Sequence, residues 1–131
     1  MRKNLGTKAT IFVYDRFTVN VRGKKFIRYA GLLSLAHQRG LTSLTTEFVR
    51  ELSNLEKGVI TFKAIAACGE QIFTGHGDAT TKNVSKMVLP HLIRVAETRA
   101  MARALRMFVG CEFTALEELS ENDFKEKGSK S

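Results

Sequence analysis

The chain has 131 residues, of which 44% are hydrophobic, and it carries a formal net charge of +8 at pH 7. That length predicts a single domain with a buried core, and the apolar fraction excludes an intrinsically disordered chain. Only short uninterrupted apolar runs occur, so the sequence predicts neither a membrane-spanning helix nor a signal peptide. We therefore expect a cytoplasmic protein whose two cysteines, Cys68 and Cys111, stay reduced.

The charge is unevenly distributed. Residues 1–110 hold 18 Lys and Arg against 7 Asp and Glu, whereas residues 111–131 hold 3 against 6. The chain is thus a basic body followed by a short acidic, polar tail. A basic excess of this size favours a polyanionic partner, most often a nucleic acid.

The first predicted unit is a β-hairpin. Residues 1–9 are polar and are expected to be loose, and residues 17–22 then alternate between apolar and polar side chains, the period of a strand. The RGKK turn at 22–25 leads into a second strand over 25–29.

A helix and a three-stranded meander follow. Apolar residues on one helical face predict a helix over 30–40, with a glycine at its end. Strands are predicted at 41–52, 59–68 and 71–77, and the second of these alternates so that one of its faces is buried.

The pattern then becomes helical. A polar loop is expected over 78–86, and a long helix over 87–109 follows, in which Pro90 either occupies the first turn or makes a kink. A short helix is expected afterwards, because Thr114 and Glu117 have the spacing of a capping box.

These elements predict an α+β fold of order β-β-α-β-β-β-α. The hairpin and the meander make an antiparallel β-sheet, and both helices pack on one face of it. We expect one folded domain over 10–120 and a flexible polar tail over 121–131.

Three arginines mark the long helix. Arg99, Arg103 and Arg106 fall within about 60° of arc on a helix of 3.6 residues per turn. The opposite side carries Ile93, Ala100, Met101, Ala104, Leu105 and Phe108. Small residues at 100 and 104 would let the helix lie close to the strands, with a cationic ridge pointing away from the sheet.

Like charges at this spacing repel one another unless an anion lies beside them. One reading is a nucleic-acid backbone, because guanidinium groups bind phosphate oxygens bidentately. The other is a carboxylate of a neighbouring subunit or of the acidic tail. The first reading depends on guanidinium groups that lie unpaired and open to solvent. Glu97, one turn from Arg94, is expected to form a buried or interfacial ion pair.

Two further basic groups are candidates for phosphate binding. The hairpin carries Arg22, Lys24, Lys25 and Arg28. They are either a solvated turn or a groove wall beside Phe26 and Tyr29, whose rings could stack on bases. Lys82 and Lys86 precede the long helix, where positive charge is unfavourable to the helix dipole and favours an external anion.

The sequence predicts no enzyme, cofactor or metal site. It has neither a P-loop nor a dinucleotide-binding glycine motif. The GHGD stretch at 75–78 is expected to be a strand-ending loop rather than a phosphate nest. His37, His76 and His91 share no ligand spacing, and no nucleophile and base pair can be argued.

Several stretches resemble a known family. VRGKKFIRYAGLLSLAHQRG, GHGDA, PHLIRVAETRAMARALRMFVG and TALEEL are similar to the DdrA-like bacterial and phage proteins, which belong with the Rad-fifty-two-type single-strand annealing proteins. The resemblance spans residues 17–119 and is strongest in the RALRMF segment of the long helix.

The resemblance implies a ring of subunits with single-stranded DNA in a basic groove between the long helix and the hairpin. By motif, Arg103 and Arg106 match groove-lining arginines. The chain departs from the pattern at Ala102, where relatives carry a basic residue, and at Gly31 or Leu32, where an arginine is expected. These departures favour strand binding or end protection over full annealing.

We therefore expect a homo-oligomeric, nucleoid-associated protein of recombination and double-strand break repair. It would bind single-stranded DNA or 3′ ends through Arg99, Arg103, Arg106, Lys24, Lys25, Arg28, Lys82 and Lys86. Two alternatives stay open. One is an RNA-binding module, and the other is a structural oligomer whose arginines form salt bridges between subunits.

Overall fold

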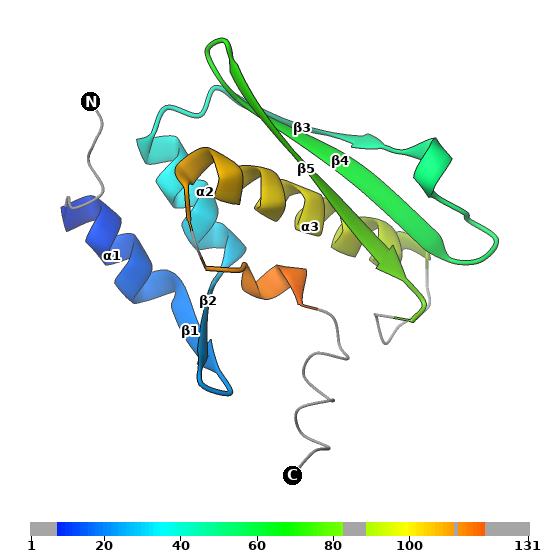
Figure 1. The fold of residues 1–131 in the computed structure, drawn as a ribbon, viewed down its shortest axis with the longest axis horizontal. Helices are drawn as coiled ribbons and strands as arrows, with labels where there is room; N and C mark the ends of the chain where they lie inside the picture. Colours follow the sequence, from blue (N-terminus) through cyan, green and yellow to red (C-terminus); the bar gives the residue numbers. More distant parts are fainter. Residues whose placement is uncertain (1–7, 83–88, 112, 120–131) are drawn as a thin grey trace.

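A computed structural model describes residues 8–82, 89–111 and 113–119 (Figure 1). Its elements, in chain order, are α1 (Lys8–Phe17), β1 (Thr18–Val21), β2 (Lys24–Ile27), α2 (Tyr29–Gln38), β3 (Ser43–Phe48), the 3-10 turn η1 (Arg50–Leu52), β4 (Val59–Cys68), β5 (Gln71–Thr80), α3 (Leu89–Val109) and the 3-10 turn η2 (Leu116–Glu118). The predicted α+β class is confirmed. None of the helices in the described ranges is long and apolar enough to cross a membrane.

The strands form two antiparallel sheets rather than one. β1 pairs with β2, and β3, β4 and β5 form a separate sheet in that order. β4 and β5 pair along their whole length, from Val59 opposite Thr80 to Cys68 opposite Gln71. Figure 1 shows α3 lying along one face of the larger sheet, with α1, the hairpin and α2 beyond it on the side away from the sheet. α3 is therefore the central element of the fold.

Helix α1 was missed from the sequence. Its residues are rich in β-branched and aromatic side chains, which favour strands when read locally. Thr10 and Val13 lie one turn apart on its buried face, and tertiary packing against α2 overrides the local preference. Residues 8 and 9, expected to be loose, belong to this helix, whereas residues 1–7 lie outside the described part of the chain.

Other boundaries moved. β3 ends at Phe48, and the predicted end of that strand forms η1 instead. β5 continues to Thr80, past the predicted end at residue 77. α3 has Pro90 in the first turn of its described part, as one of the two readings predicted, and Gly110, with φ of 71°, follows its end. The tail over 121–131 lies outside the described residues.

The core lies on both sides of α3. Against the sheet, α3 buries Ala96, Ala100 and Ala104. A larger cluster adds Leu32 and Leu35 of α2, each without solvent exposure. Burial on both sides leaves little of the C-terminal half of α3 exposed, and this decides where its arginines lie.

Candidate nucleic-acid interface

The backbone of α3 lies unusually close to β5. A Cβ atom built at Gly75 would lie 2.5 Å from the backbone nitrogen of Ala104, and one at Gly77 would overlap the backbone nitrogen of Ala100. Small residues on the helix therefore face glycines on the strand, as the alanines at 100 and 104 predicted in part. The GHGD stretch at 75–78 lies inside β5, so it is neither the expected strand-ending loop nor a phosphate nest.

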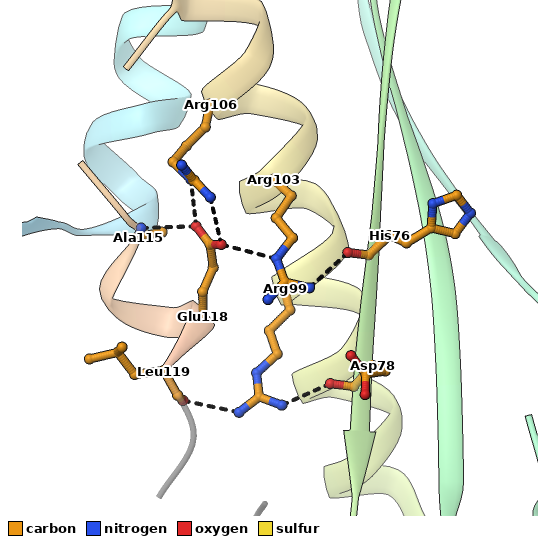
Figure 2. Close-up of polar contacts among 8 residues, drawn as sticks. All are labelled: His76, Asp78, Arg99, Arg103, Arg106, Ala115, Glu118 and Leu119. Atoms are coloured by element: carbon orange, nitrogen blue, oxygen red, sulfur yellow. Dashed lines mark hydrogen bonds and ion pairs between the residues drawn. The ribbon is translucent and has the colours of Figure 1, made fainter. Parts of the chain in front are cut away.

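Arg99 is not part of a solvent-exposed ridge. The residue is 5% exposed. Its Nη1 donates to the carbonyl oxygen of Asp78 at 2.8 Å, and its Nη2 donates to that of Leu119 at 3.0 Å (Figure 2). The prediction that Arg99 points away from the sheet to bind phosphate is wrong, because the close approach of α3 brings this side chain onto the backbone of β5.

Arg103 and Arg106 share one carboxylate. Arg106 donates from Nε to Glu118 Oε2 at 2.7 Å and from Nη2 to Oε1 at 2.9 Å, and Arg103 donates from Nε to Oε1 at 3.0 Å (Figure 2). The side chain of Glu118 is 3% exposed, against 39% for Arg103 and 27% for Arg106. The expectation of unpaired guanidinium groups is wrong, and the alternative of a carboxylate from the acidic tail is confirmed for these two arginines.

The surroundings of Glu118 fix its ionisation. Burial raises the pKa of this carboxyl group, but hydrogen bonds from Arg106, from the backbone N–H of Ala115 and from Arg103 outweigh burial, so the net pKa lies below its ordinary value of 4.5. Glu118 is therefore a carboxylate at neutral pH. One negative charge faces two positive charges, so the cluster keeps a net positive charge.

This shift predicts an acid-dependent loss of stability. A carboxylate whose folded pKa is lowered stabilises the fold above its unfolded pKa, and that contribution is lost as pH falls through the folded pKa. We expect the free energy of unfolding to fall as pH drops below 4.5. Urea titrations at several pH values from 7 to 3 measure the free energy of unfolding. The Glu118→Gln variant should lose less over this range, and an equal loss in both proteins would contradict the assignment to Glu118.

Glu118 belongs to a segment that we call the strap, residues 113–119. The backbone N–H of Ile27, at the end of the hairpin, donates to the carbonyl oxygen of Thr114 at 3.0 Å. The backbone N–H of Tyr29 donates to Glu117 Oε1 at 2.8 Å, at the start of α2. The strap therefore joins the hairpin, α2 and α3. The predicted capping box of Thr114 and Glu117 is wrong by one residue, because the backbone N–H of Ala115 donates to the carboxylate of Glu118.

A groove opens beside the two paired arginines. Its volume is about 630 Å³, and its lining residues are Thr74, Gly75, His76, Arg103, Arg106, Met107, Gly110 and Cys111. Nη1 of Arg103 donates to the carbonyl oxygen of His76 at 3.0 Å on the β5 wall. Among the described residues, Nη2 of Arg103 and Nη1 of Arg106 have no hydrogen-bond partner. The groove thus keeps guanidinium donors available for an external anion.

The hairpin presents a second basic surface. Its turn has Arg22 and Gly23 in left-handed conformations, with φ of 53° and 85°, as a tight two-residue hairpin requires. Lys24, Lys25 and Arg28 are exposed. The sequence has no Asp or Glu between residues 16 and 46, so no acidic side chain of this segment neutralises them. Phe26 is 9% exposed and cannot stack on a base, contrary to one reading of the sequence.

The remaining candidates are scattered. Lys82 is exposed, and Lys86 lies outside the described residues. Glu97 accepts a hydrogen bond from the Thr46 hydroxyl at 2.5 Å, and no salt bridge joins it to Arg94 in the described part of the chain. The expected ion pair within the chain is therefore wrong, and the interfacial pair stays a prediction. In the same ranges, no three His, Cys, Asp or Glu side chains are placed to hold a metal ion.

The positions where the sequence departs from the resembled family have no room for a long side chain. Ala102 is fully buried. A Cβ atom at Gly31 would lie 2.5 Å from Cβ of Phe17 on α1, and Leu32 is fully buried. A basic side chain at any of these positions would not reach solvent without rearranging the core.

The chain matches no protein-family model, no curated protein and no solved structure. The resemblance to single-strand annealing proteins therefore stays a prediction.

Proposed function

We propose that the protein binds single-stranded DNA in recombination and double-strand break repair, holding the phosphate backbone rather than the bases. The observation that carries the proposal is the hairpin surface, where Lys24, Lys25 and Arg28 are exposed in a segment without carboxylates. Arg103 and Arg106 add a second contact at the groove. Arg99 is left out, because it is buried with both terminal nitrogens on backbone carbonyls.

Strand binding of this kind has no sequence preference and is strongly salt-dependent. Lysine and arginine neutralise phosphates and release counterions, which gives a logarithmic slope of about −0.7 per phosphate on single strands. A buried Phe26 removes one aromatic platform, so charge rather than stacking dominates. The protein would bind and protect strands or 3′ ends, rather than carry out full annealing.

The double variant Lys24→Gln, Lys25→Gln tests the proposal. If each lysine neutralises one phosphate, affinity for a labelled 30-nucleotide strand at 0.1 M salt should fall about 20-fold, and the salt slope should decrease by about 1.4. Fluorescence anisotropy at several salt concentrations measures both.

The matched control is Arg50→Gln, Lys57→Gln, which removes the same charge from exposed positions in and beyond η1. Its affinity should change little. Equal losses in the two double variants would show a response to net charge alone and would contradict a hairpin site. No binding by the unaltered protein would reject the proposal outright.

The resemblance also implies a closed ring of about ten or more subunits, in keeping with the symmetry of homo-oligomers. Light scattering with and without an oligonucleotide measures subunit number and ligand binding together. Competition between RNA and DNA strands of equal length separates this proposal from an RNA-binding module. The alternative in which Arg103 and Arg106 make salt bridges between subunits loses support, because both pair with Glu118 of the same chain.

A further inference from the structure

We infer that Glu118 occupies the place on Arg103 and Arg106 where a strand phosphate binds, and that a phosphate of the bound strand displaces this carboxylate. The inference rests on the proposed function and adds a regulation to it: the protein carries its own competitor for the anion that it binds.

The donors that hold Glu118 are of the kind that bind a phosphate. Arg106 contacts both oxygens of Glu118 from Nε and Nη2, and Arg103 adds a third charge-assisted bond to Oε1. A guanidinium fork binds a carboxylate and a phosphate in the same bidentate manner. Figure 2 shows the carboxylate of Glu118 between the two guanidinium groups.

The carboxylate can leave while the strap stays attached. Among the contacts of the strap that do not involve Glu118 are Thr114 O with Ile27 N, Leu119 O with Arg99, and the Glu117 carboxylate with Tyr29 N. Rotation of the Glu118 side chain would free both arginines, and the backbone N–H of the fully buried Ala115 would lose its acceptor.

The exchange has a defined effect on affinity. A strand phosphate that replaces a carboxylate on paired arginines releases fewer counterions than one that meets free guanidinium groups. Removing the charge of Glu118 should therefore strengthen binding about five- to tenfold, the effect of removing one negative charge beside two partly exposed arginines. The salt slope should also steepen by up to about 0.7, or one more phosphate.

The Glu118→Gln variant tests this directly with the same 30-nucleotide strand. The matched control is Glu117→Gln, which makes the same charge change on the neighbouring residue, whose carboxylate contacts the start of α2 rather than the arginines. We expect tighter binding and a steeper slope for Glu118→Gln alone. Equal tightening in both variants, or none in either, overturns the inference while the unaltered protein still binds.

A measurement on the unaltered protein covers the case in which the variant does not fold. The Nε–H resonances of Arg103 and Arg106 report their bonds to Glu118. Both should shift on addition of the strand, and the Nη contacts of Arg99 to backbone provide a reference that should not move. Unmoved Arg103 and Arg106 signals under saturating strand overturn the exchange. No binding by any of the proteins rejects the proposed function, and this inference falls with it.

Discussion

Replacing Gly77 with alanine should cost about 3 kcal/mol of folding stability or more, because overpacking at a backbone contact exceeds the usual cost of an extra methyl group. The added Cβ would overlap the backbone nitrogen of Ala100 and would lie 2.6 Å from the carbonyl oxygen of Ala96. Backbone atoms of a helix cannot rotate aside as a flexible side chain can, so α3 would have to move away from β5. Thermal unfolding should show a midpoint lower by about 10 °C or more.

Thr74→Ala is the control for that measurement. Thr74 lies on the same strand but is exposed on the opposite face, so its truncation should change stability by no more than about 0.5 kcal/mol. If Gly77→Ala were as stable as Thr74→Ala, the close approach of α3 and β5 would be wrong, and with it the placement of the arginines.

The second large effect is expected at Glu118. Its replacement by alanine removes the acceptor for both arginines and for the backbone N–H of Ala115. Removing one partner of a buried charge pair costs about 3–5 kcal/mol. Because Arg103 and Arg106 keep partial access to water, we expect a smaller loss of about 2–3 kcal/mol.

Chemical denaturation at pH 7 measures this loss, with Glu70→Ala as the control. Glu70 is an exposed carboxylate between β4 and β5, and its removal should cost almost nothing. A Glu118→Ala variant as stable as Glu70→Ala would show that the strap does not depend on the arginine cluster. A loss of several kcal/mol would show that the strap is part of the folded core.

The sequence predicted most of the architecture because its strongest signals are local. The alternation in β4 reflects a single buried face, and the helical period from residue 89 to 109 remains readable although α3 is buried on both sides. α1 was missed because its helical state depends on contact with α2, whereas its β-branched and aromatic side chains favour a strand locally. The separation of the two sheets depends on long-range contacts that no local pattern encodes.

The site was harder to predict than the fold. The helical positions of Arg99, Arg103 and Arg106 were correct, but their environment depends on a segment that returns to α3 after Gly110. Charge counting did show an acidic tail that could pair with them, without identifying Glu118. The close approach of α3 to β5 did have a signal in the sequence. Glycines at 75 and 77 lie on the same face of a strand, and alanines at 100 and 104 lie one helical turn apart.

The arginines of α3 that bind the backbone of β5 also limit where the sheet can gain a strand. β5 is an edge strand, and an edge strand normally offers free backbone groups that can pair with another chain and seed aggregation. Here the carbonyl oxygens of His76 and Asp78 already accept from Arg103 and Arg99. An incoming strand would have to displace both side chains over this stretch, so the opposite edge strand, β3, is the easier place for an added strand to pair.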